Sequence, residues 1–92
     1  MLNDGIKIFV HDEVEYVKGW YATSEILDFR KSKWENVDLE FHNQDGITTS
    51  FFSKSLINST NTNIAMLVEV RIVKGDYVIT LTTIPKVYKK AK

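Results

Sequence analysis

The feature that most constrains the fold is a pair of alternating apolar segments on either side of residues 74–76 (KGD). Residues 64–73 (IAMLVEVRIV) and 77–84 (YVITLTTI) place an apolar side chain at almost every second position. A period of two is typical of strands with one face on a core, and a glycine in the connection suits a tight turn. Pro85 would end the second strand, because it has no N–H for the ladder. The sequence therefore predicts an antiparallel hairpin.

A second hairpin is predicted over residues 35–53. Residues 35–43 alternate cleanly, and the polar side of that strand consists of Asn36, Asp38, Glu40 and His42. The stretch NQDG supplies the reversal, with Gly46 able to adopt positive φ, and a strand rich in threonine and phenylalanine follows. We interpret the polar side as the solvated side of this strand, not as a catalytic face.

The N-terminal third predicts two further strands. Residues 6–10 (IKIFV) form a short strand, and residues 14–29 form a long one with a bulge or sharp bend at Gly19, where the missing Cβ relieves crowding. A turn at residues 30–33 (RKSK) follows. A helix over residues 24–34 is the competing interpretation, but basic residues interrupt its apolar stripe.

Composition excludes several classes of protein. The 92 residues contain no cysteine, which excludes disulfides, thiolate metal ligands and a cysteine nucleophile. With 43% hydrophobic residues the chain is not of the disordered class, and no apolar run approaches the roughly 20 residues that span a bilayer. An acidic residue precedes the first short apolar stretch and no cleavage site follows, so we expect no signal peptide. The expectation is one cytoplasmic domain over residues 1–92 without membrane contact, with an N-terminal strand extension at 1–13 and a basic tail at 85–92.

Charge is balanced overall but unevenly distributed. The formal net charge is zero, which argues against indiscriminate binding to polyanions. Residues 1–46 carry ten acidic and five basic side chains, whereas residues 47–92 carry two acidic and seven basic ones. This asymmetry indicates either an acidic surface opposed to a basic one, or two halves that interleave in a sheet and cancel.

The order of these elements resembles the OB-fold, the oligonucleotide- and oligosaccharide-binding family. Its five strands correspond to VKGWYATSEILDF, ENVDLEFHN, ITTSFFS, MLVEVRIV and YVITLTTI, within residues 14–84. A long first strand bent at a glycine is a feature of that barrel, and Gly19 is suitably placed. Between strands three and four, KSLINSTNTN leaves at most one helical turn in place of the usual capping helix. The resemblance implies an all-β, five-stranded OB-like barrel with an extra N-terminal strand and a reduced or absent helix; an SH3-like barrel or an open sheet is the alternative.

Binding of single-stranded nucleic acid, DNA in the first instance, is the function that this resemblance implies. The family stacks bases on aromatic rings, and basic side chains follow the phosphates. If Phe51 faces the core with Ile47 and Thr49, Phe52 is expected on the opposite, solvated face. The candidate contact residues are Trp20, Trp34, Phe52, Lys31, Lys33, Lys54 and Arg71. Core positions for the tryptophans are the alternative, and the acidic side chains of the second strand would repel a polyanion.

Catalysis has little support in the sequence. Residues 11–13 (HDE), and His42 with Asp45, match no metalloenzyme spacing, and no nucleophile elbow or phosphate-binding loop is present. We therefore expect no enzyme, no catalytic residue, no metal and no cofactor. The alternative function is that of a small phage- or plasmid-type accessory protein that binds or inhibits a host protein through an acidic β-face. A homodimer formed through an edge strand, residues 77–84 or 6–10, is a further expectation.

Overall fold

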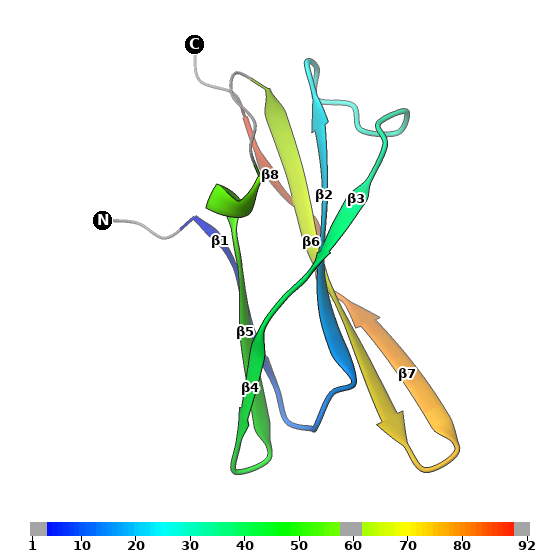
Figure 1. Ribbon diagram of the computed structural model, residues 1–92. Coiled ribbons are helices and arrows are strands. Elements are labelled where there is room, and N and C mark those ends of the chain that lie inside the picture. Colours follow the sequence, from blue (N-terminus) through cyan, green and yellow to red (C-terminus); the bar gives the residue numbers. More distant parts are fainter. Residues whose placement is uncertain (1–3, 58–61, 90–92) are drawn as a thin grey trace.

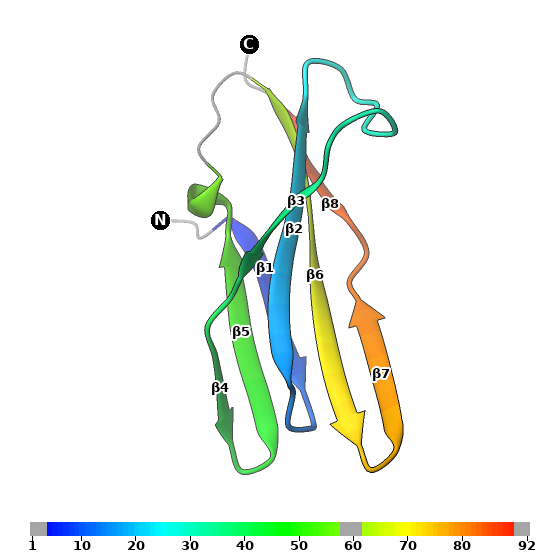
Figure 2. The ribbon, with the colours of Figure 1, turned by 45° about the vertical axis from the view of Figure 1, so that its right-hand side comes forward.

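Two antiparallel sheets pack against each other (Figures 1 and 2). The computed structural model describes residues 4–57 and 62–89. In chain order the elements are β1 (Gly5–Val10), β2 (Tyr16–Ser24), β3 (Glu35–Asp38), β4 (Phe41–Gln44), β5 (Ile47–Ser53), the 3₁₀ turn η1 (Lys54–Leu56), β6 (Asn63–Lys74), β7 (Tyr77–Thr82) and β8 (Lys86–Tyr88). The small sheet has the strand order β1-β5-β4. The large sheet has the order β3-β2-β6-β7, and β8 pairs with residues near the start of β6.

The chain is all-β as expected, but the expectation of a five-stranded barrel is wrong. Eight strands are present in the two described ranges, and the sheets do not close into a barrel. On one side the chain passes directly from β3 in the large sheet to β4 in the small sheet. On the other side, among the residues described, β1 pairs with β5 and β7 pairs with β6, and no ladder joins β1 to β7. The architecture is therefore an open pair of sheets.

The hairpin predicted over residues 64–84 is confirmed, with its second strand ending at Thr82, and so is the N-terminal strand, which is β1; of the hairpin predicted over residues 35–53, residues 41–53 form as β4 and β5. The register of β6 and β7 runs from Glu69↔Thr82 to Lys74↔Tyr77. β4 and β5 are joined by Asp45 and Gly46, whose φ angles are 55° and 81°. A type I′ turn requires positive φ at both central positions, and an Asp-Gly pair is one of the few sequences that adopts it readily.

The strand predicted for residues 14–29 ends early, at Ser24. The Ser24 hydroxyl accepts a hydrogen bond from the Ile26 N–H at 3.2 Å and donates one to the Asp28 carbonyl oxygen at 3.3 Å. A serine that bonds the backbone of the following residues in this way turns the chain. Residues 25–34 consist of turns and irregular chain, so both the strand continuing to residue 29 and the competing helix are wrong.

The C-terminal part also departs from expectation. Residues 86–88 form β8 instead of a loose tail, and residues 90–92 lie outside the described ranges. Between β5 and β6 the structure describes only the short turn η1, in line with a reduced helix, and residues 58–61 of the predicted polar loop also lie outside. No helix in the described ranges is long and apolar enough to cross a membrane.

The core lies between the two sheets and depends on a close approach at Gly19. Phe52 of β5 is fully buried, and a Cβ on Gly19 would lie 2.6 Å from two atoms of its ring. The pairing of β2 with β6 runs through Gly19 without interruption, so the predicted bulge is wrong. The glycine is required because only a residue without a side chain lets the ring lie against the backbone of β2. The buried cluster around it contains Ile8, Val17, Leu39, Ile57, Ile64, Met66, Val68, Val70 and Ile72.

One stretch of chain serves both sheets. The strand predicted for residues 35–43 is divided into β3, which pairs with β2, and β4, which pairs with β5. Between them Leu39 is buried, and its N–H donates to the Val17 carbonyl oxygen at 2.9 Å. Val37 and Phe41 are half-buried against the core on either side of Leu39, so the predicted alternation persists through the crossing although the hydrogen-bonding partner changes.

Candidate binding face

Two of the predicted contact residues lie on the outer face of the large sheet. The Trp20 indole N–H donates to Oε1 of Glu69 at 2.9 Å, and the Tyr16 hydroxyl donates to the other oxygen of the same carboxylate. The hydrogen bond to Glu69, then burial, raises the pKa of the Tyr16 phenol. Arg71 forms an ion pair with Glu15, with 3.0 Å between Nε and Oε1. The polar groups of both predicted residues are therefore engaged by acidic neighbours.

The remaining predicted residues are dispersed. Trp34, Lys31 and Lys33 lie in the loop between β2 and β3, with the lysines exposed and the tryptophan half-buried. Lys54 lies in η1, with its Nζ 5.2 Å from the ring centroid of Tyr88. The seven predicted residues thus occupy the outer face of the large sheet, a loop, η1 and the core, and they do not form a single surface.

The expected exposure of Phe52 is wrong. Phe52 is fully buried, whereas Phe51 is 39% exposed, so the two residues face the opposite way from the prediction. The inward-facing residues of β5 are Thr48, Ser50 and Phe52. A solvent-facing role for Phe52 in ligand binding is therefore excluded by its position.

Two hydrogen-bonded hydroxyl groups explain why β5 buries Phe52 and exposes Phe51. Thr48 donates to the Asp12 carbonyl oxygen at 2.5 Å and accepts from the Asn43 side-chain amide at 2.9 Å. Ser50 donates to the Glu40 carbonyl oxygen at 2.7 Å. Because a buried hydroxyl is tolerated when it is hydrogen-bonded, small polar residues occupy core positions in β5 and the apolar Phe51 is left outside.

The outer face of the small sheet is the surface that sequence reasoning missed. Lys7 of β1 lies opposite Phe51 of β5, and Phe9 lies opposite Thr49, which in turn lies opposite His42 of β4. We call these five residues the Phe9–Phe51 face. Phe9 is 61% exposed, and the Nζ of Lys7 lies 5.3 Å from its ring centroid. Two aromatic rings on neighbouring strands are thus presented to solvent with a cation beside them.

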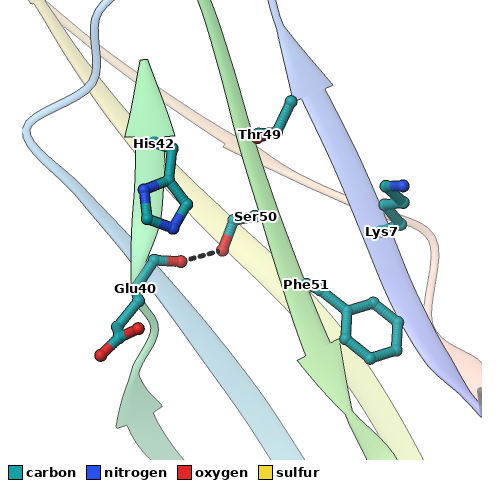
Figure 3. A pocket seen from close by; sticks show the side chains of 6 residues that line it. All are labelled: Lys7, Glu40, His42, Thr49, Ser50 and Phe51. Atoms are coloured by element: carbon teal, nitrogen blue, oxygen red, sulfur yellow. Dashed lines mark hydrogen bonds between the residues drawn. The ribbon is translucent and has the colours of Figure 1, made fainter. Parts of the chain in front are cut away.

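Two shallow hollows lie on this face and share His42 and Thr49. One, of 280 Å³, is shown in Figure 3, where Glu40 and His42 stand on one side and Phe51 and Lys7 on the other. The second hollow, of 320 Å³, is lined by Phe9, His42, Gln44, Asp45, Ile47 and Thr49. Together they make the outer face of the small sheet uneven, with space beside each exposed ring.

The electrostatics of the hollows are mixed. Of the side chains that line them, Lys7 is the cation, and Glu40 and Asp45 are the acids. In the parts of the chain described, no group of three or more histidine, aspartate or glutamate side chains is placed to hold a metal ion. The face therefore offers aromatic contact area and a few hydrogen-bonding groups.

The polar side chains of residues 35–43 are exposed, as predicted, but they do not share one surface. Asp38 lies opposite Lys18 in the large sheet, whereas Glu40 and His42 line a hollow over the small sheet. An acidic face along one strand is therefore not formed.

The exposure of Phe9 has a signal in the sequence. Lys7 and Phe9 are two residues apart in a strand and so point the same way, and the lysine marks that side as solvated. For Phe51 no such signal exists, because the apolar pattern of residues 47–53 favours the wrong face.

Comparison of the chain with protein-family models, with curated proteins and with solved structures finds no match.

Proposed function

We propose that the protein is a non-catalytic module that binds single-stranded nucleic acid on the Phe9–Phe51 face. The observation that carries the proposal is the exposure of both rings on adjacent strands of one sheet, 61% for Phe9 and 39% for Phe51. Burying an exposed phenylalanine side chain is favourable by about 1.5–3 kcal/mol. A ligand that stacks on these two rings and removes them from water would gain free energy in this way.

The spacing of the rings suits successive bases. Phe9 is opposite Thr49, and Phe51 is two residues further along β5, so the rings are diagonal neighbours across the β1–β5 ladder. Diagonal pairs in antiparallel sheets are about 7–8 Å apart. Antiparallel sheets that bind single strands present aromatic side chains on their exposed face and stack two or three bases on them.

The charge on this face predicts how such a complex behaves. Lys7 is placed to meet a phosphate, while Glu40 and Asp45 border the hollows and oppose a polyanion. With about one phosphate neutralised, log K should fall with log [salt] with a slope of about −0.7. Two stacked bases contribute about 2–6 kcal/mol, less than the roughly 8.2 kcal/mol of a micromolar complex. We therefore expect weak binding that changes little with salt.

The test is a titration of the ¹⁵N-labelled protein with an unstructured DNA octanucleotide, followed by amide chemical shifts at submillimolar protein. We expect shifts confined to β1, β4 and β5. Phe9→Ser and Phe51→Ser should each weaken binding about tenfold, because each removes one stacking platform worth about 1–3 kcal/mol. Ile84→Ser is the matched control, because Ile84 is also exposed (88%) but lies in the segment between β7 and β8.

Three outcomes contradict the proposal: no saturable shifts, shifts that are the same with duplex DNA, or an affinity that neither phenylalanine variant changes. A steep salt dependence would point to a basic surface elsewhere. A parallel titration with the RNA octanucleotide of the same sequence shows whether the affinity depends on the sugar.

A further inference from the structure

The β6–β7 hairpin carries apolar side chains that nothing in the described chain covers. All six residues of β7 are exposed, among them Val78 (53%), Ile79 (40%) and Leu81 (49%). Figures 1 and 2 show the reason: β7 lies at the edge of the large sheet, away from the small sheet that covers β2 and β6.

Apolar residues occupy both faces of this hairpin. On the inner face, Ile79 and Leu81 lie opposite Ile72 and Val70, which are each 4% exposed in the core. The apolar surface therefore continues from the core onto β7 without a cover. On the outer face, Val78 lies opposite another exposed valine of β6. An antiparallel sheet commonly has polar side chains on its solvated face, so the apolar residues on the outer face of this hairpin depart from that pattern.

The free edge of β7 lacks the features that keep sheet edges apart. Residues 77–82 (YVITLT) contain no charge and no proline, and their register with β6 has no bulge. Within residues 4–57 and 62–89, β7 pairs with β6 only, so its other edge is unpaired. Natural edge strands are usually protected by lysine, proline or a bulge, and an unprotected edge pairs with another strand. β1, one of the two edge strands of the small sheet, differs because it carries Lys7.

We propose that β7 pairs antiparallel with β7 of a second copy of this chain, so that the two large sheets join into one. A second copy fits because the strand is self-complementary. A two-fold axis perpendicular to the sheet places the inner faces of both large sheets on the same side of the joined sheet. Residues that lie opposite each other then point to the same face, so an odd-numbered residue of one copy pairs with an odd-numbered residue of the other, and an even-numbered one with an even-numbered one. Two registers satisfy this rule and pair five residues of each β7. In one register the two-fold axis passes by Thr80 and residues 78–82 are paired, and in the other it passes by Ile79 and residues 77–81 are paired.

Both registers place apolar groups together and no like charges in contact. With Thr80 at the axis, Ile79 lies opposite the second copy's Leu81. With Ile79 at the axis, the isoleucines face each other, and Leu81 lies opposite the second copy's Tyr77. Cross-strand pairs of aliphatic or aromatic side chains stabilise a sheet, and an uncharged strand meets its own copy without repulsion.

The same symmetry sets the shape of the dimer. Both small sheets lie on the same side of the joined large sheet, and the inner faces of the two β7 strands form the floor between them. No free edge remains at β7, so the assembly closes at two copies.

Sedimentation velocity of the full chain from low micromolar to submillimolar concentration tests the proposal. We expect a monomer–dimer equilibrium with no larger species. Ile79→Lys should weaken dimerisation at least tenfold, because it places a charge in the apolar contact. Ile26→Lys is the matched control, since Ile26 is 64% exposed in the loop between β2 and β3 and should leave the equilibrium unchanged. Circular dichroism of each variant confirms that it is folded.

Cysteine scanning gives a second readout, because the chain has no cysteine of its own. Residues facing each other across a two-fold axis are about 4.5–5.5 Å apart at Cα, within the range that a disulfide bridges. Either Thr80→Cys or Ile79→Cys should therefore form a covalent dimer on mild oxidation, and Thr49→Cys on the small sheet should not. A monomer at all concentrations, a dimer insensitive to Ile79→Lys, or cross-linking no stronger at β7 than at the control would overturn the proposal. These results do not depend on nucleic acid, so they are separate from the outcome for the Phe9–Phe51 face.

Discussion

Replacement of Gly19 by alanine should destabilise the protein through one identifiable contact. The new Cβ would lie 2.6 Å from Cδ2 and Cε2 of the Phe52 ring and 2.8 Å from Cγ, well inside contact distance. Phe52 is fully buried, so the ring cannot move aside into solvent. Overpacking of this kind costs about 1–3 kcal/mol, although alanine in a strand is otherwise better than glycine by about 0.5–1 kcal/mol. For a domain of this size, each kcal/mol lowers Tm by roughly 4–8 °C.

Urea unfolding followed by tryptophan fluorescence measures this loss, with the m-value expected to be unchanged. Phe52→Leu supplies the control, because the smaller side chain vacates the space that the new methyl group needs. Gly19→Ala should therefore be much less harmful in the Phe52→Leu background than in the native one, and the double-mutant cycle should show favourable coupling. A neutral Gly19→Ala variant, or an equal cost in both backgrounds, would refute the account of the close approach.

Three further predictions concern stability. The pKa of Tyr16 is raised above its ordinary value of 10.0, so the stability that its protonated hydroxyl contributes is complete below pH 10.0 and is lost as the pH rises through the raised pKa. Urea unfolding at about pH 8 and about pH 11 measures this loss. The free energy of unfolding should fall more between the two pH values for the native protein than for Tyr16→Phe. Thr48→Val should cost about 1–3 kcal/mol in urea unfolding, because the Asp12 carbonyl and the Asn43 amide lose the buried hydroxyl. Gly46→Ala should cost about 1–2 kcal/mol, because φ is 81° there, and Gly46→Asn should cost less, as Tm by calorimetry would show.

The sequence predicts strands well where alternation and turn chemistry agree. Residues 64–82 combine a period of two with a glycine turn, and residues 41–53 contain Asp45 and Gly46, which adopt the required left-handed conformation. The extent of β2 was not predictable from strand propensity, since a local serine hydrogen bond ends the strand at Ser24. Nor does alternation specify pairing, so the change of sheet near Leu39 left no trace in the pattern.

The candidate site was less predictable than the fold, because its location depends on which face of β5 is buried. Hydrophobicity favours Phe51 inside, whereas the buried hydroxyls of Thr48 and Ser50 are hydrogen-bonded to the carbonyl oxygens of Asp12 and Glu40, 36 and 10 positions away, and the Phe52 ring lies against the backbone at Gly19. The residues that flank Thr48 and Ser50 in the sequence do not indicate these hydrogen-bond partners.

The direct passage of the chain from β3 to β4 determines together which side chains of these two strands face the core. Inside and outside alternate without a break from Val37 through Leu39 to Phe41, although the hydrogen bonds change from β2 to β5. An insertion of a single residue between Asp38 and Phe41 would therefore turn β4 inside out if β3 kept its place, whereas an insertion of two residues would preserve both faces. β3 and β4 therefore cannot shift by one residue relative to each other without exposing the buried side of one of them, which makes this short crossing intolerant of a change of one residue in length.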